Sequence, residues 1–202
     1  MSAMQSLRLL PKAVKKGDER AVAAVCRCPQ DRPQEVFRCL LKIAKKGDER
    51  LIAALGSVLD GAGHSSLTFD LGIHGWLGKA LRDSEVADNG DVRLIKVVCA
   101  RLENDNKDVR CAAVSVLCLV ACIGNECGIS EVCSRLEHTR FGVRQTALEA
   151  LSRIAKKGDQ RAISAVRARL GDRSRIVREV AGRVLHRLQE SGSDVAVTRT
   201  AK

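Results

Sequence analysis

Aromatic residues are scarce in this sequence, which contains no tyrosine, one tryptophan and three phenylalanines among 202 residues. Proteins that hold single-stranded nucleic acids usually stack the bases on aromatic side chains, so this scarcity argues against that mode of binding. Long apolar runs are also missing, because none approaches the roughly 20 residues that a membrane-spanning helix needs. We therefore expect a core of Leu, Val, Ile and Ala in a chain without a membrane span.

The usual sequence signatures of catalysis are missing as well. The chain has no paired carboxylates at a catalytic spacing, no nucleophile elbow and no His-Glu dipeptide. The recurring Lys-Lys-Gly-Asp sequence is not a phosphate loop, because lysine precedes glycine and the glycine-rich spacing is missing. The sequence therefore predicts a protein that is not an enzyme and needs no cofactor.

The nine cysteines are odd in number, and no two of them form a CxxC pair. In helical proteins such residues usually serve as small buried apolar groups in a reducing compartment, so we expect a cytoplasmic or other intracellular location. Cys111, Cys118 and Cys122 leave a zinc site as an alternative, but no histidine lies at a ligand spacing, and we expect no metal. Residues 1–17 contain no acid, which leaves a mitochondrial presequence as the alternative location.

One stretch, Arg144 to Leu170, shows how the chain is built. Both of its halves have apolar residues at helical spacing along one stripe. Between the halves, Lys156-Lys157-Gly158-Asp159 combines lysines suited to a last helical turn with a glycine able to take positive φ and an aspartate able to cap a helix. This arrangement predicts two antiparallel helices joined by a tight turn.

The same arrangement recurs along the chain, with turn glycines at Gly17, Gly47, Gly90, Gly124 and Gly158. A helix pair of this kind cannot bury its apolar stripes alone, so we expect the copies to stack on one another. The second helices align at Val22, Ile52, Ile95, Ile129 and Ile163, then at Val25, Leu55, Val98, Val132 and Val166, and finally at Leu59, Leu102, Leu136 and Leu170.

These repeats predict an all-α fold, an α-solenoid of about five antiparallel helix pairs within residues 1–190. Its C-terminal capping helix is expected to turn Val177, Ala181, Leu185 and Leu188 inward. Residues 191–202 have little apolar content and are predicted to form a disordered tail. The pairs are expected at residues 3–29, 33–59, 67–102, 107–136 and 141–170, and the capping helix at 174–189.

The third unit departs from this period, since Gly90 follows Gly47 by 43 residues where the next step is 34. Several glycines between residues 60 and 80 disfavour a regular helix, so we expect a shortened first helix and a longer loop. Insertions in repeat proteins often fall on a binding face, which makes Trp76 a candidate anchor for a partner. The alternative is that Trp76 fills space inside the repeat.

A Val-Arg pair occurs every 34 residues, at Val109-Arg110, Val143-Arg144 and Val177-Arg178. Together with the Gly-Asp turns, this pattern resembles HEAT repeats over residues 3–189, and in particular the short phycobilisome-lyase-like class. Asp108 matches the acidic position before the pair, whereas Gly142 and Ile176 depart from it.

The resemblance implies a right-handed α-solenoid with a concave face, and arginines 110, 144 and 178 that bond neighbouring units. It also implies a scaffold that binds other proteins. Bilin lyase subunits share this repeat class, so a bilin-lyase-like or chaperone-like role is an alternative.

The chain is basic, with a formal net charge of +11, and residues 137–202 carry fifteen Lys and Arg against seven Asp and Glu. Such a region suits a partner protein with an acidic surface, with nucleic acid or another acidic surface as the alternative. We therefore predict a non-catalytic scaffold that binds a protein through its concave face and its basic C-terminal units. The candidate partner-binding residues are Trp76, Arg167, Arg169, Arg173 and Arg175.

Overall fold

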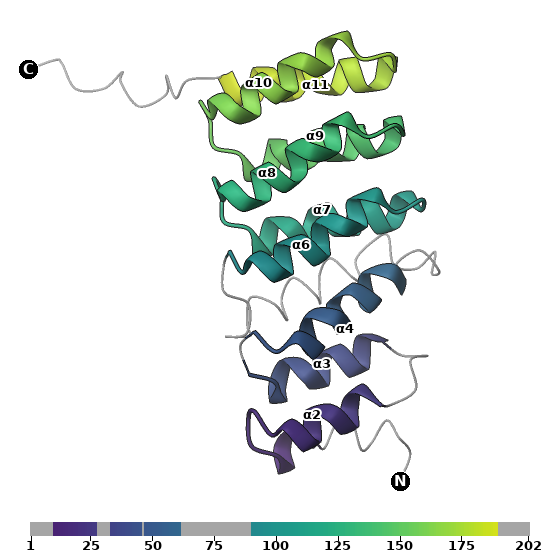
Figure 1. Ribbon diagram of the computed structural model, residues 1–202, viewed down its shortest axis with the longest axis vertical. Helices are drawn as coiled ribbons and strands as arrows, with labels where there is room; N and C mark the ends of the chain where they lie inside the picture. The colour runs from purple at the N-terminus through teal and green to yellow at the C-terminus, as the bar shows by residue number, and fades with distance from the viewer. Residues whose placement is uncertain (1–9, 28–32, 46, 62–89, 190–202) are drawn as a thin grey trace, which may run out of the picture. The chain divides into compact units, whose positions relative to one another are not determined.

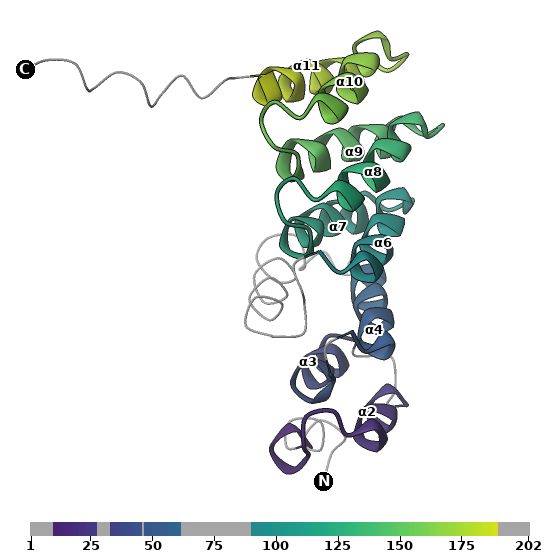
Figure 2. The ribbon, with the colours of Figure 1, turned by 60° about the vertical axis from the view of Figure 1, so that its left-hand side comes forward.

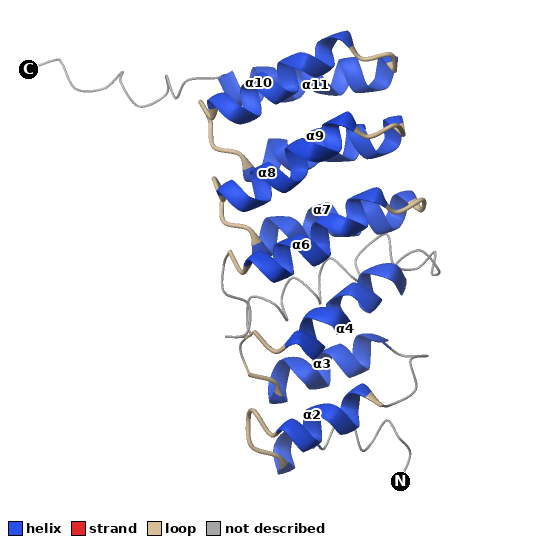
Figure 3. Cartoon of the chain, in the orientation of Figure 1, coloured by secondary structure: helices blue, strands red, loops and turns tan. Residues whose placement is uncertain are grey.

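The computed structural model describes residues 10–27, 33–45, 47–61 and 90–189 (Figure 1). Within these residues every regular element is a helix and no strand occurs, as the colouring of Figure 3 shows. The prediction of an all-α repeat fold is therefore confirmed, while its handedness and its number of pairs stay predictions. The chain divides into two compact units, Met1–Cys122 and Ile123–Lys202.

Among the described helices of the N-terminal unit, α3 packs on α2 and on α4, while α6 packs on α4 and on α7. Pro33 begins α3, as expected from the fixed φ of proline at a helix start. The second helix α6 continues into a single 3₁₀ turn, η2. The elements are α2 (Glu19–Cys26), α3 (Pro33–Ile43), α4 (Glu49–Asp60), α6 (Val92–Ala100), η2 (Arg101–Glu103) and α7 (Lys107–Val120).

In the C-terminal unit each first helix again packs against a second helix. Here α9 packs against α8, and α11 packs against both α9 and α10, as Figure 2 shows from the side. Helix α11 occupies the segment predicted as the capping helix. The elements are α8 (Glu126–Ser134), η3 (Arg135–Glu137), α9 (Phe141–Ile154), α10 (Gln160–Ala168), η4 (Arg169–Gly171) and α11 (Arg175–Gln189).

A glycine with positive φ opens the turn before each described second helix, from Gly17 (φ 88°) to Gly158 (φ 81°). The next residue then caps that helix, and the Asp159 carboxylate accepts a hydrogen bond from the Ala162 N–H at 3.0 Å. The prediction that the lysines lie in the last helical turn is wrong, because α9 ends at Ile154 and Lys156 follows it. The interaction of these lysines with the helix dipole is therefore weaker than predicted, since the effect of the dipole falls off beyond the last turn.

The turn glycines also connect successive layers of each unit. The Gly124 N–H donates to the Ile154 carbonyl at the end of the next first helix, at 2.6 Å, and the Gly158 N–H donates to the Leu188 carbonyl at 2.8 Å. In the N-terminal unit Gly17 bonds Ile43 in the same way. A carbonyl left without a partner at a helix end is thus satisfied by the preceding turn.

The aligned apolar positions of the second helices are buried in both units, with one exception. Leu136 is buried, and the Arg169 guanidinium of the following pair donates to its carbonyl at 3.0 Å. The equivalent Leu170 is 41% exposed, against expectation. The described residues contain no further second helix after α11 that would cover Leu170 in the same way. In α11, Leu185 is only half-buried, and Val180 and Val184 complete the buried stripe.

Candidate protein-binding surface

A buried ion pair joins the starts of the two long helices α9 and α11. The Arg144 guanidinium donates through Nε and Nη2 to the two carboxylate oxygens of Asp172, both at 2.7 Å. The two side chains are only 11% and 3% exposed. Hydrogen bonds from Arg144 lower the pKa of Asp172 despite its burial, and the same bonds raise the pKa of Arg144.

Arg144 also holds the loop that precedes its own helix, because its Nη1 donates to the carbonyls of His138 and Thr139 at 2.8 Å. Arg178 and Arg110 make the equivalent bonds, and Arg178 reaches the Asp172 carbonyl at 2.7 Å. Each arginine of the Val-Arg pairs therefore braces the loop before its own helix, and Arg144 also bonds the next layer.

A second row of arginines connects successive second helices. Arg169 pairs with Glu137 of the preceding layer at 2.8 Å, and in the N-terminal unit Arg101 pairs with Asp60 at 2.9 Å. The Arg169 side chain is 18% exposed. Of the predicted partner-binding arginines, Arg169 is thus already engaged in holding η4 against η3.

The other predicted arginines lie where α10 ends and α11 begins. Arg167 in the last turn of α10 and Arg173 in the following loop are exposed, and neither makes an ion pair with any described residue. Arg175 pairs with Glu179 at 2.7 Å, but its side chain remains 83% exposed. These three cations are brought to one end of the last helix pair, whereas Trp76 lies outside the described residues.

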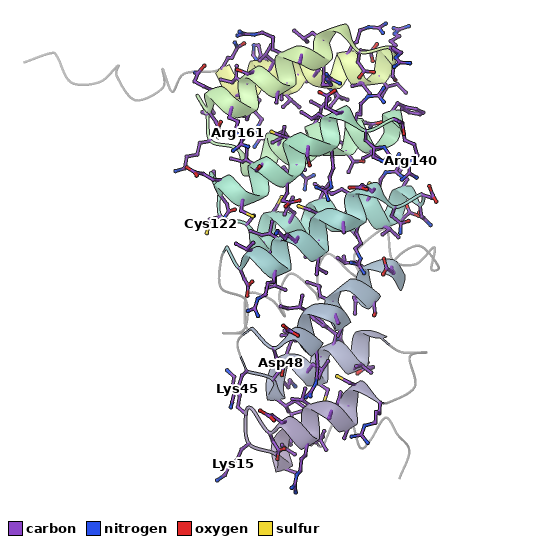
Figure 4. All side chains as sticks on the ribbon, in the orientation of Figure 1. Lys15, Lys45, Asp48, Cys122, Arg140 and Arg161 are labelled. Atoms are coloured by element: carbon purple, nitrogen blue, oxygen red, sulfur yellow. The ribbon has the colours of Figure 1, made fainter. Side chains whose placement is uncertain are left out.

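The acidic side chains of the C-terminal unit are mostly engaged within the unit. Asp172, Glu137 and Glu179 pair with arginines, and Asp159 caps α10. Figure 4 labels two exposed arginines of this unit, Arg161 and Arg140, on opposite sides of the view. Among the described residues of this unit, Arg167 and Arg173 are therefore exposed without an acidic partner.

The cysteines of the predicted alternative zinc site do not gather. Cys111 and Cys118 are half-buried in α7, and Cys122 is exposed in the turn after it. Throughout the part of the chain that the structure describes, no group of three His, Cys, Asp or Glu side chains could hold a metal ion. None of the described helices is both long enough and apolar enough to cross a membrane.

Two features of the C-terminal unit were not expected from the sequence. Asp172, which lies 28 residues after Arg144 and in the loop before α11, completes the buried pair with Arg144. Phe141 and Ile176 are 50% and 47% exposed although apolar. The sequence signal was that each replaces a charged residue of the repeat. Ile176 stands at the position of Asp108, and Phe141 stands at the position of Lys107 and Arg175.

Comparison with known proteins supports the repeat assignment. Residues 95–186 match the family described as HEAT repeats, and the narrower phycobilisome-lyase-like class stays a prediction. No curated protein matches the sequence. Among solved structures, the chain is similar to the crystal structure of an engineered protein, with 18% identity over 93% of this chain and 92% of that chain and a TM-score of 0.44. A likeness this weak supports no inference about function.

Proposed function

Residues 95–186 consist of HEAT repeats, and from this we propose that the chain is a non-catalytic scaffold that binds a protein with an acidic surface. HEAT repeats generally serve as surfaces for protein interaction. A stack of helix pairs cross-linked by buried bonds presents its side chains rigidly, which lowers the entropy lost when a partner binds.

The observation that carries this proposal is the excess of exposed positive charge in the C-terminal unit. Arg167 and Arg173 are exposed without an acidic partner among the described residues, and Arg175 is exposed beside Glu179. Exposed charge without a partner steers oppositely charged proteins and raises the rate of their association. The proposed surface therefore runs from the end of α10 to the start of α11. The part of it on α10, a second helix, belongs to the proposed concave face.

Capture of partners from an extract of the source organism tests this proposal. The purified chain is immobilised, and bound material is compared at low and high salt, before and after nuclease treatment. A protein partner that resists nuclease supports the scaffold. Capture that nuclease abolishes contradicts it and favours nucleic acid, whose binding weakens steeply with salt.

Charge reversal locates the surface. The double variant Arg167→Glu, Arg173→Glu should weaken partner capture while leaving the fold intact, because both side chains are exposed. Arg153→Glu is the matched control. Arg153 is also exposed, but it lies in the last turn of α9, whereas the first turn of α9 lies next to the start of α11. Equal losses in the two proteins would mean that net charge alone drives binding. Arg169 is left unchanged because its ion pair with Glu137 joins two layers.

A further inference from the structure

Two exposed apolar side chains lie at the starts of α9 and α11. Phe141 is the first residue of α9 and is 50% exposed, and Ile176 is the second residue of α11 and is 47% exposed. A stable fold gains nothing from leaving such side chains in water, since burying one stabilises by about 1.5–3 kcal/mol. Scattered apolar residues are common on protein surfaces, so their positions relative to one another and to charge decide whether they matter.

The ion pair between Arg144 and Asp172 brings these two helix starts together. Arg144 lies one helical turn after Phe141, and Asp172 lies four residues before Ile176. The two residues are joined by bonds of 2.7 Å, so the first turns of α9 and α11 are neighbours in successive layers. Phe141 and Ile176 therefore face solvent at the same end of the C-terminal unit.

An arginine stands immediately before each of these apolar residues in the sequence. Arg140 and Arg173 are exposed, and Arg175 stands immediately before Ile176 with its side chain 83% exposed. Neither helix has an acidic residue in its first turn. We call this set, Arg140, Phe141, Arg173, Arg175 and Ile176, the arginine edge.

We propose that the arginine edge docks an acidic segment of a partner protein that also carries apolar side chains. This inference rests on the proposed function and names the chemistry of its partner. Carboxylates of the segment pair with the arginines, while its apolar side chains cover Phe141 and Ile176. Arginine and phenylalanine are both enriched in protein interfaces relative to the rest of the surface.

The mixed character of the edge selects against other occupants. Nucleic acid would use the arginines, but an aliphatic side chain such as Ile176 offers nothing to a phosphate backbone or to base stacking. A second copy of this edge would bring arginines against arginines, and like charges across an interface disfavour association. An acidic and apolar peptide satisfies both parts of the surface.

Three labelled probes test the inference by fluorescence anisotropy with the full chain at physiological salt. The first is a 12-residue peptide that alternates Glu or Asp with Leu or Phe, and the second has the same acids but serine at each apolar position. The third is a 12-base-pair DNA duplex. The first peptide should bind about tenfold tighter than the second, because only it buries apolar surface.

Variants assign that difference to the edge. Phe141→Ser with Ile176→Ser should reduce affinity for the first peptide about tenfold and leave the second peptide unchanged. Ile176→Ser alone, which removes less buried surface, should reduce it about threefold and serves if the double variant melts early. Ile123→Ser is the matched control, because Ile123 is 66% exposed. Its neighbour Gly124 donates to the carbonyl of Ile154, the last residue of α9, so Ile123 lies at the end of α9 opposite to Phe141.

Each other outcome has a defined meaning. Equal affinity for the two peptides, weakened by Arg173→Glu, overturns the docking inference and leaves the proposed function standing. Equal losses from Ile123→Ser and Ile176→Ser also overturn it, because the apolar contact would then not be specific to the edge. Tightest binding of the DNA duplex overturns the inference and the proposed function together.

Discussion

First helices begin differently in the two units. In the N-terminal unit, α7 follows Asn106, whose side chain caps the Asp108 N–H at 2.8 Å, and Asp108 itself lies in the first turn. In the C-terminal unit, α9 follows Arg140, which makes no side-chain cap bond, and no acid lies in its first turn. A side-chain cap and an acid in the first turn both stabilise a helix start, so α7 has two stabilising features there that α9 lacks.

The arginine of the Val-Arg pair also has different described partners in the two units. In the C-terminal unit Arg144 forms a buried pair with Asp172, whereas Arg110 at the equivalent position of the N-terminal unit donates to the loop carbonyls of Asn104 and Asp105. The start of α9, which lacks a side-chain cap, is thus held by a strong buried pair close to it. The comparison indicates that the buried pair of Arg144 and Asp172 stabilises the helix starts that carry the arginine edge.

Removal of Asp172 is the strongest way to break this comparison. Asp172→Ala leaves the Arg144 charge buried without its carboxylate partner, which should cost about 3 kcal/mol of unfolding free energy. Asn104→Ala, at the equivalent position of the N-terminal unit, removes only a loop hydrogen bond to the Asn106 N–H and should cost about 1 kcal/mol. Urea unfolding of both variants measures the difference. Equal losses would show that the buried pair contributes no special support.

The pair should also make the C-terminal unit sensitive to acid. The pKa of Asp172 in the folded protein lies below its unfolded value because Arg144 donates hydrogen bonds to the carboxylate. The pair therefore contributes its full stability above about pH 4, the ordinary value for Asp, and loses it as the pH falls through the folded pKa. The stability gap between the natural chain and Asp172→Asn should shrink between neutral pH and pH 2. A gap that stays constant would place the pKa of Asp172 at its ordinary value.

Alanine at the turn glycines sharpens the comparison, because the turns are alike in both units. Gly17 and Gly124 have positive φ, and a Cβ there would clash with the side chains of Lys45 and Lys156 respectively. Gly158 has the same backbone conformation, but a Cβ would meet nothing within 4 Å. Gly158→Ala should cost about 1 kcal/mol from backbone strain alone.

Gly17→Ala and Gly124→Ala should each cost somewhat more, since the lysine must move as well. Chemical denaturation ranks the three variants, and Lys156→Ala in the Gly124→Ala background should recover the difference from Gly158→Ala. If Gly158→Ala were the most damaging of the three, the lysine contacts would not contribute to the turns.

A cap installed at Arg140 should have the smallest effect. Arg140 has the extended backbone of a helix N-cap, with φ −79° and ψ 125°, so Arg140→Asp should stabilise the C-terminal unit by about 1 kcal/mol. The same change should weaken binding of the acidic and apolar peptide, because it replaces a cation of the edge. Thermal unfolding and peptide anisotropy together measure this exchange. A variant that is more stable and binds as tightly would remove Arg140 from the arginine edge.

The sequence was sufficient for the repeated elements because each depends on local chemistry. Glycine and aspartate set the turns, Pro33 begins α3, and the apolar period selects the helix faces that are buried. None of these features requires knowledge of a distant residue. The all-α repeat fold followed for that reason.

Contacts between layers were harder to predict because they depend on single residues in neighbouring repeats. Asp172 has no repeated counterpart, since His138 and Asn104 occupy its position in the preceding repeats. The sequence predicts Arg169 as a surface cation, but its side chain is only 18% exposed and pairs with Glu137 of the preceding layer. Leu170 fits the buried pattern of the second helices and is nevertheless 41% exposed.

Photo-crosslinking from the arginine edge tests the functional account most directly. A benzophenone amino acid replaces Ile176 in one protein and Ile123 in another, two exposed isoleucines at opposite ends of the C-terminal unit. Each protein is irradiated with the labelled acidic and apolar peptide at physiological salt. The account predicts a crosslinked product from position 176 and little from position 123. Equal yields from the two positions, or a higher yield from position 123, would contradict it.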